Sequence, residues 1–247
     1  MNQHSFIQVR GLHRHFQMGA EIVHALDGVD ATIEQGEFMG IIGPSGSGKS
    51  TLLYLIGGLD QPTSGEIWVD GTDIAALDEN HLAQYRQKSI GFIFQSYNLL
   101  PRTTALENAE LPLMYNSKIS TKERKKRAIE ALARVGLEDR LDHTPNQLSG
   151  GQQQRVAIAR SLVNHPVILL ADEATGNLDT RTSYEVMQLF QDLNDKGMTI
   201  AFVTHEPDIV RFSKRTIVLK DGKVIRDEPV SNRLNAAEEL AKLPNAD

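Results

Sequence analysis

The sequence predicts an α/β domain built on a mainly parallel sheet with a helical insertion, and three patterns support this. Short, nearly all-apolar runs recur along the chain, as in strands covered on both faces. Amphipathic helical patterns lie between them, and this alternation is typical of a parallel α/β sheet. The stretch from Gln95 to Pro166 contains helical patterns only, which predicts a helical lobe between two strands of the sheet.

The expected strands form an N-terminal group and a central group. In the first group, short strands and turns alternate over residues 6–9, 11–16 and 29–33, with Gly36 as the final turn. The central strands are the apolar runs at residues 38–42, 90–94, 167–171 and 200–203.

Several helices are marked by their apolar spacing or by their first residue. One has apolar residues at i, i+3, i+4 and i+7 and is followed by Gly197, a residue suited to ending a helix; these positions are Val186, Leu189, Phe190 and Leu193. Ser120 with Glu123 predicts a capping box, and another helix is expected to begin near Gly150. A short amphipathic helix is expected after Asn232, with Leu234, Leu240 and Leu243.

The composition is that of an ordinary globular protein, with 40% hydrophobic and 23% charged residues in 247. No run approaches the roughly twenty apolar residues of a membrane span, and residues 1–4 do not resemble a signal peptide. A net charge of -6 argues against nucleic-acid binding, and the absence of cysteine excludes disulfides and thiolate metal sites. We therefore expect a soluble, cytoplasmic protein that reaches a membrane only through a partner.

The segment GPSGSGKS at residues 43–50 fits the P-loop pattern, and it lies between an apolar strand and a helix as that pattern requires. Glycines let the backbone wrap around phosphate, so that N–H groups and the helix start face anionic oxygens. Lys49 would reach the β- and γ-phosphates, and the Ser50 hydroxyl would ligate Mg²⁺. The alternative is a Gly/Ser-rich turn without a ligand.

Two acidic residues, Asp172 and Glu173, directly follow the apolar run at residues 167–171. They are expected at the carboxyl edge of the sheet, where open α/β folds bind ligands. Asp172 would hold Mg²⁺, and Glu173 would act as general base toward the attacking water. The alternative is an ordinary strand end with its carboxylates in solvent.

Two further polar residues follow central strands. His205 is predicted to contact the γ-phosphate or to orient Glu173 and the water, although a lone histidine is often structural. Gln95 would reach the Mg²⁺ or the water, with a surface amide as the alternative. His13 and His15 have i, i+2 spacing but no evident further ligand, so no zinc site is expected there.

A second phosphate-binding helix start is predicted at LSGGQ, residues 148–152. Ser149 can cap the helix, while Gly150 and Gly151 leave its N–H groups open to an anion. A simple Ser-Gly helix cap is the alternative.

LSGGQ followed by QQRVAIARSL, with a P-loop before and an acidic strand end after, resembles the nucleotide-binding domain of ATP-binding cassette (ABC) transporters over about residues 6–226. The resemblance implies that Phe16 stacks on adenine, Gln95 is the Q-loop glutamine, Asp179 lies in the D-loop and His205 is the switch histidine. It also assigns ATP contacts to the P-loop and signature residues, namely Gly43, Ser45, Gly46, Ser47, Gly48, Lys49, Ser50, Thr51, Ser149, Gly150, Gly151 and Gln152.

The resemblance further implies a P-loop NTPase core at about residues 1–95 and 165–230, with an N-terminal antiparallel β subdomain. It implies a helical subdomain at about residues 96–164, and the tail covers about residues 231–247. Two copies would bury two ATP molecules head to tail, each signature facing the partner's P-loop, and permease subunits would hold the dimer at the inner face of the membrane. Ala174 stands where close relatives usually carry proline, and Phe16 replaces the usual tyrosine.

The motifs at residues 58–65, 98–101 and 106–113 are similar to the branch of macrolide-efflux, lipoprotein-release and cell-division ATPases. Two other hypotheses remain: a soluble ABC protein of repair or translation, which should carry a coiled coil or a second cassette, and a nucleotide-gated scaffold with little turnover, favoured only by Ala174. Candidate permease contacts, or else lobe core, are Tyr97, Leu99, Leu100 and Leu106. The basic run at residues 122–127 is interpreted as a solvated helix face, with a contact to anionic lipid or to an acidic partner as the alternative.

Overall fold

The computed structural model describes residues 5–244, and its first sheet is antiparallel. Its strand order is β2-β1-β4-β5, and the strands are β1 (Ile7–Met18), β2 (Glu21–Ile33), β4 (Ser64–Val69) and β5 (Thr72–Asp73). β1 pairs with β2 along one edge and with β4 along the other, so it continues through the turn that the sequence predicts near Gly11. The expected N-terminal antiparallel sheet is confirmed, with longer strands.

The second sheet has six strands in the order β10-β9-β3-β8-β7-β6. Its strands are β3 (Phe38–Ile42), β6 (Ile90–Ile93), β7 (Ile168–Asp172), β8 (Thr199–Thr204), β9 (Arg215–Lys220) and β10 (Lys223–Pro229). All neighbouring pairs are parallel except β9 with β10. The prediction of a mainly parallel sheet is confirmed, and the four central runs match strands to within about a residue.

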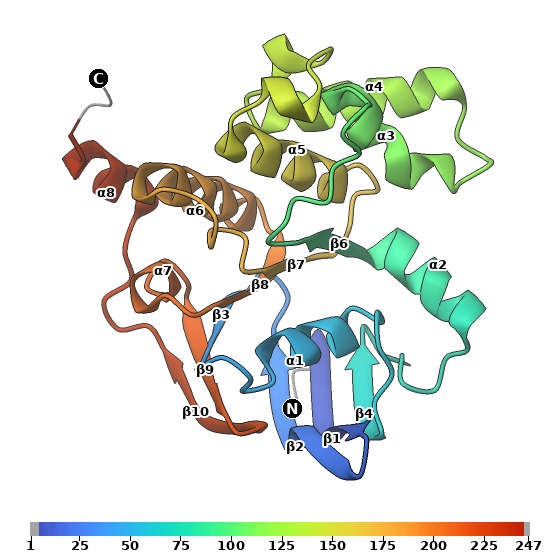
Figure 1. Cartoon of the computed structure of the whole chain (residues 1–247), viewed down its shortest axis with the longest axis vertical. Helices are drawn as coiled ribbons and strands as arrows, with labels where there is room; N and C mark the ends of the chain where they lie inside the picture. Colours follow the sequence, from blue (N-terminus) through green and yellow to red (C-terminus); the bar gives the residue numbers. More distant parts are fainter. Residues whose placement is uncertain (1–4, 245–247) are drawn as a thin grey trace.

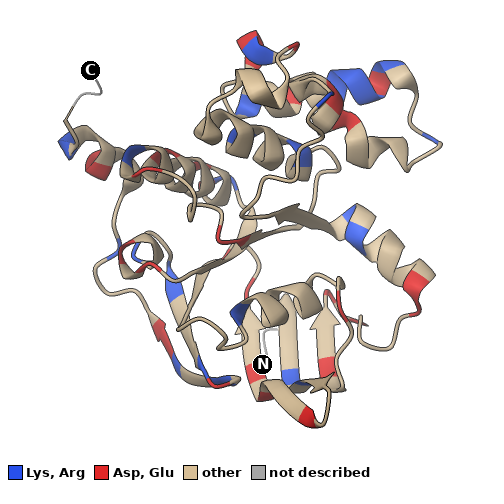
Figure 2. Ribbon diagram, in the orientation of Figure 1, with Lys and Arg blue, Asp and Glu red and all other residues tan. Residues whose placement is uncertain are grey.

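Helical elements alone fill the chain between β6 and β7. They are α3 (Ala105–Met114), α4 (Thr121–Arg134), the 3-10 turns η1 (Glu138–Arg140) and η2 (Pro145–Gln147), and α5 (Gly150–Leu162). Ser120 caps α4 by accepting from the Glu123 amide. The basic residues of α4 stand among acidic ones (Figure 2), and Arg127 donates to Glu123 at 2.7 Å, which fits a solvated face.

Five more helices accompany the sheets. They are α1 (Lys49–Ile56), α2 (Glu79–Ser89), α6 (Thr180–Asp195), α7 (Pro207–Val210) and α8 (Ala236–Lys242). Gly197, with φ +94°, follows α6 as expected, and the tail helix is shorter than its leucines suggest. Within residues 5–244, no helix combines the length and the apolar character needed to cross a bilayer. The predictions for residues 1–4 and for the end of the tail, 245–247, lie outside the residues that the structure describes.

The six-stranded sheet separates two hydrophobic cores. Leu169 belongs to one core together with α5, α6 and the helical part, whereas Ile168 and Leu170 belong to the other together with α1 and the first sheet. Successive strand residues point to opposite faces, which is why these strands are apolar throughout. Figure 1 accordingly shows α1 and α6 on opposite sides of β7 and β8.

Candidate functional site

The P-loop connects the end of β3 to the start of α1 by a tight backbone path. Gly48 stands at the N-cap of α1 with φ +98°, and a Cβ atom there would collide with the Ala25 carbonyl oxygen. A Cβ atom at Gly43 would collide with the carbonyl oxygen of Leu219. No side chain caps α1, so its first N–H groups face the loop and are available to an anion.

Lys49 is buried and folds back over the loop. Its ammonium donates to the carbonyl oxygens of Gly43 and Pro44, each at 2.9 Å. The Ser47 hydroxyl is also buried and has no hydrogen-bond partner within residues 5–244. The loop therefore holds a charged donor and an unsatisfied hydroxyl where the sequence predicts phosphate.

Ser50 and Asp172, two of the three predicted metal ligands, are in direct contact. The Ser50 hydroxyl donates to one Asp172 carboxylate oxygen at 2.8 Å, and the Tyr54 hydroxyl donates to the other at 2.6 Å. Burial, and then the bond to Asp172, raise the pKa of Tyr54, so it remains a donor at neutral pH. Tyr54 was not predicted, although it lies one helical turn after Ser50 and the i, i+4 spacing could have indicated it.

Glu173 and His205 also lie in contact at the carboxyl edge of the sheet. His205 Nδ1 is 3.2 Å from Glu173 Oε1. Glu173 has φ +49°, an uncommon conformation for a residue with a side chain, and its amide donates to Val203 on β8. The chain thus turns sharply at Glu173, which places this carboxylate apart from that of Asp172.

Gln95 approaches the same edge from β6. A Cβ atom at Gly176 would lie 3.0 Å from Gln95 Nε2 and 3.5 Å from Glu173 Oε2, so both side chains border Gly176. The Gln95 carbonyl also accepts from Asn177. The side-chain amide of the buried Gln154, on α5, donates to the carbonyl of Ala174. This bond holds the loop at the position where the sequence has alanine in place of proline.

These elements enclose a cavity of about 560 Å³. It is lined by Val23, Ala25, Ser45, Gly46, Ser47, Gly48, Lys49, Ser50, Thr51, Glu173 and His205. Phe16 pairs with Val23 across β1 and β2, and the Arg14 guanidinium carbon lies 4.4 Å from the centre of its ring. The P-loop, the acidic edge and the ribbon that carries Phe16 are therefore brought together.

The signature segment folds as a capped helix start. The Gln152 amide donates to the Ser149 hydroxyl at 3.3 Å, and the Ser149 amide donates to the Gln152 side chain at 3.0 Å. Asp179 caps α6 by accepting from the Thr182 amide and hydroxyl, and these bonds lower the pKa of its carboxyl group. A Cβ atom at Gly151 would collide with the Thr182 methyl group, so the starts of α5 and α6 pack closely.

The two predicted phosphate-binding helix starts do not meet within the chain. α5 packs on one face of the sheet and α1 on the other, and no signature residue lines the P-loop cavity. Ser149, Gly150, Gly151 and Gln152 therefore stand apart from the P-loop of their own chain.

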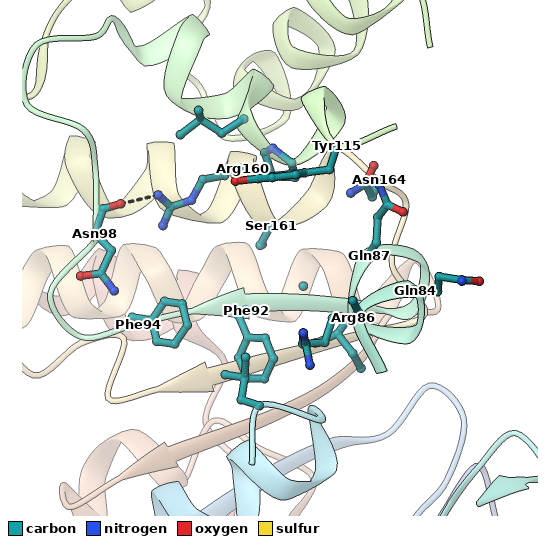
Figure 3. Close-up of a pocket in the computed structure, with 16 residues that line it drawn as sticks. Gln84, Arg86, Gln87, Phe92, Phe94, Asn98, Tyr115, Arg160, Ser161 and Asn164 are labelled. Atoms are coloured by element: carbon teal, nitrogen blue, oxygen red, sulfur yellow. Dashed lines mark hydrogen bonds between the residues drawn. The ribbon is translucent and has the colours of Figure 1, made fainter. Parts of the chain in front are cut away.

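A second, larger groove of about 800 Å³ lies between α2 and β6 on one side and α3 and α5 on the other (Figure 3). Phe92, Phe94 and Tyr115 line it, and Arg160 closes one end by donating to the carbonyls of Tyr97 and Asn98. Of the candidate permease contacts, Leu106 belongs to the core and Leu99 packs against it, whereas Leu100 is exposed.

The structure adds a ligand candidate beside two histidines that the sequence does not show. His13 and His15 were expected to lack further ligands, but His13, His15 and Asp27 have ligand atoms that all lie within 4.8 Å of one another. The Asp27 carboxylate comes from β2. The sequence alone does not show that β2 pairs with β1 in the register that places Asp27 opposite His13.

Comparison with known proteins gives a consistent result. The model of the ABC transporter family matches residues 26–176. An uncharacterized ABC transporter ATP-binding protein of Methanocaldococcus jannaschii, MJ0796, is 51% identical over 226 residues, which is 90% of this chain and 96% of that protein. The macrolide export ATP-binding/permease protein MacB of Bdellovibrio bacteriovorus is 45% identical over 96% of this chain, but the match covers only 37% of MacB.

Solved structures agree with this. The dimeric post-hydrolysis state of the cassette MJ0796, bound to ADP and Pi, has a TM-score of 0.84 and 49% identity, covering 91% of this chain and 98% of that chain. A cbiO1 structure from Clostridium perfringens, part of the transporter complex cbiONQ, has a TM-score of 0.81 and 32% identity over 96% of this chain and 91% of that one.

Proposed function

The chain belongs to the ABC transporter family, and on that premise we propose that it is an ATP-binding and ATP-hydrolysing subunit that pairs with a second copy to drive movement of membrane subunits. The main support for this proposal is that three motifs meet at one cavity. Lys49 and Ser50 of the P-loop and the Glu173–His205 pair line the same space, and Asp172 adjoins it through the hydrogen bond that it accepts from Ser50.

The P-loop binds the triphosphate of ATP. Its free amides and those at the start of α1 donate hydrogen bonds to phosphate oxygens, and Lys49 would exchange its bonds to Gly43 and Pro44 for bonds to phosphate. Phe16 offers a partly exposed ring for stacking on adenine. Ser45, Gly46, Ser47, Gly48 and Thr51 complete the cradle.

The residues around Ser50 fit a magnesium ion. The hydroxyl of Ser50, the carboxylate of Asp172 and the amide oxygen of Gln95 are hard oxygen donors of the kind Mg²⁺ prefers, and the first two are already in contact. Bound Mg²⁺ supplies charge neutralisation at the phosphates.

Glu173 accepts the proton of the attacking water. Its carboxylate is held by the contact with His205, and Gln95 borders Gly176 on the same side of the loop. His205 is a positioning residue toward Glu173, and its ring is exposed enough to reach the γ-phosphate as well. Positioned base catalysis of this kind typically contributes 10²–10⁴-fold to a rate.

Completion of the site requires a second chain. The signature residues Ser149, Gly150, Gly151 and Gln152 stand apart from the P-loop of their own chain, and the amides of Gly150 and Gly151 remain available at the helix start. A head-to-tail pair brings each signature to the partner's ATP and excludes water around Glu173. Asp179, next to the signature through Thr182, lies at the same interface. A relative 49% identical forms a dimer in its structure with bound ADP and Pi, which supports the pairing of two chains.

The groove of Figure 3 is the surface we assign to the membrane subunits. Leu59 and Tyr115 expose apolar surface there, and Arg86 and Arg160 line the polar part. A permease helix is the expected occupant, since MacB joins a cassette similar to this chain to a permease in one polypeptide. Such a contact would keep the protein on the cytoplasmic face of the membrane, and macrolide export, lipoprotein release and mechanotransmission are the candidate uses.

The test compares the wild type with Glu173→Gln. We expect the ATPase rate to fall by about 10²–10⁴-fold and ATP to hold the variant as a dimer in light scattering. Glu206→Gln, which changes the same charge at the neighbouring strand end, should keep the rate within about threefold. A wild-type rate no higher than that of Glu173→Gln would support the nucleotide-gated scaffold. An ATP-bound Glu173→Gln protein that stays a single chain would contradict the dimer.

A further inference from the structure

Four side chains with metal-ligating atoms lie on one face of the ribbon formed by β1 and β2. They come in two adjacent cross-strand pairs, His13 opposite Asp27 and His15 opposite His24. Side chains of directly paired residues are about 4.5–5.5 Å apart at Cβ, close enough for both pairs to share one ligand.

A β-bulge brings the fourth residue to this face. The register shifts between Arg14 and His15, so Ala25 is an extra residue on β2. Without it, His24 would alternate with Asp27 and point to the opposite face, because strand side chains have a period of two. Phe16 and Val23, the next pair, return to the other face of the ribbon, on the side of the nucleotide cavity.

The distances suit a small metal ion. His13 Nδ1 lies 3.3 Å from Asp27 Oδ1, and His15 Nε2 lies 3.0 Å from His24 Nδ1. Ligands about 2.0–2.1 Å from a tetrahedral ion are about 3.3 Å from one another, so two edges of such a tetrahedron are already formed. The ligand atoms of His13, His15 and Asp27 lie within 4.8 Å of one another, and rotation of the exposed His24 side chain would bring in the fourth.

Lys223 of β10 orients the carboxylate. Its ammonium lies 3.1 Å from Asp27 Oδ2, which leaves Oδ1 directed toward His13. The same hydrogen bond lowers the pKa of Asp27, so the carboxylate is ionised at neutral pH. A carboxylate held by a second group is the usual arrangement around metal ligands.

We propose that His13, His15, His24 and Asp27 bind one divalent transition-metal ion of the zinc class. Three imidazoles and one carboxylate match Zn²⁺, Ni²⁺ or Cu²⁺ and are a poor set for Mg²⁺ or Ca²⁺. The ion would join β1 to β2 directly behind Phe16 and Val23, on the opposite face from the nucleotide. This inference stands on the ribbon alone and does not depend on the ATPase proposal.

The experiment titrates Zn²⁺ into tag-free protein by calorimetry, with Mg²⁺ present and no nucleotide. We expect one ion per chain, and His15→Asn and Asp27→Asn should each weaken binding by at least about tenfold. His81→Asn is the matched control, since His81 pairs with Asp78 at 2.8 Å on an exposed surface, outside the cluster. That variant should bind as the wild type does. Co²⁺ should give the visible absorption of a tetrahedral site, which the two cluster variants lose.

Two results would overturn the inference. One is the absence of Zn²⁺ binding, which would leave a hydrogen-bonded surface cluster. The other is unchanged binding in both cluster variants, which would place the ion elsewhere, for example at His205 and Glu173. Thermal melts without metal check that the variants fold, and His24→Asn, with its more exposed ring, provides a milder variant if they do not.

Discussion

The methyl group of Thr182 occupies the space into which any side chain at Gly151 would project. The signature glycine is therefore required for packing inside the chain, quite apart from any contact with ATP. Thr182 is itself fixed, because its hydroxyl donates to Asp179 at 2.6 Å and its amide donates to the same carboxylate. Substitutions at Gly151 consequently change both the packing inside the chain and any contact with ATP, unless Thr182 is changed as well.

We predict that Gly151→Ala lowers the free energy of unfolding of the wild-type protein but not that of the Thr182→Ser variant. Overpacking of this kind costs about 1–3 kcal/mol, while alanine is favoured over glycine in helices by up to about 1 kcal/mol. Thr182→Ser removes the colliding methyl group and keeps the bond to Asp179, so Gly151→Ala should there be neutral or stabilising. Urea unfolding of the four proteins measures the coupling, and additive effects would contradict the close contact.

The same background separates folding from dimerisation. In Thr182→Ser protein, Gly151→Asp places a carboxylate at the signature, where the partner's γ-phosphate is proposed to lie. We expect ATP-driven dimers to disappear in light scattering, while Gly151→Ala in the same background still forms them. Dimers of the aspartate variant as stable as those of the alanine variant would argue against a phosphate contact at Gly151.

Ser50→Ala is predicted to remove the contribution of Mg²⁺ to ATP binding. A hydroxyl bonded to a charged group contributes about 1.5–3 kcal/mol, so affinity in Mg²⁺ should fall by more than about tenfold and approach the value in EDTA. Binding in EDTA should change little, because Lys49 and the loop amides remain. Tyr54→Phe is the control, since it removes the other donor to Asp172 and leaves Ser50 in place. If the ratio of ATP affinity in Mg²⁺ to ATP affinity in EDTA were the same in Ser50→Ala as in the wild type, Ser50 would be excluded from the metal site.

His205→Ala should slow turnover by about 10²-fold or more while ATP affinity stays within about threefold. The reason is that His205 acts through Glu173, which it contacts at 3.2 Å. Residues that act as a unit are not additive, so Glu173→Gln with His205→Ala should be no slower than Glu173→Gln alone. Single-turnover rates with separate ATP titrations distinguish this from a binding defect. A double variant slower than the single one by the full His205 factor would indicate independent roles.

The buried parts of the fold are those the sequence predicts best. Strand β7 is apolar on both faces because a core lies on each side, and its prediction was correct to within a residue. Helix α2 buries only Leu82, and β10 is almost entirely exposed, so neither has a periodic apolar pattern to indicate it. For exposed elements, the helix or strand propensity of the residues is the main indication in a single sequence, and it is weak.

The site follows the same rule. Motif residues such as Lys49, Ser50 and Asp172 are recognisable from spacing, because their chemistry depends on order along the chain. The contacts of Gly151 with Thr182 and of Gln154 with Ala174 depend on how α5 packs against its neighbours, which no local pattern specifies. The histidine cluster depends on a register shift of one residue at Ala25.

If the groove binds the proposed membrane subunits, charge placed in it should uncouple the chain from them without affecting its ATPase chemistry. Leu59 and Tyr115 line the groove and are 44% and 84% exposed, so Leu59→Glu and Tyr115→Glu should leave the fold intact. An unpaired carboxylate buried against an apolar permease helix costs several kcal/mol, which should reduce co-purification with the membrane subunits by more than about tenfold. The ATPase rate of the isolated cassette should be unchanged, because the groove and the nucleotide cavity share no lining residue.

Met114→Glu is the matched control, since Met114 is 58% exposed beside Tyr115 but does not line the groove, and it should retain the partner. Full retention by Tyr115→Glu and Leu59→Glu would mean that the membrane subunits bind at another surface.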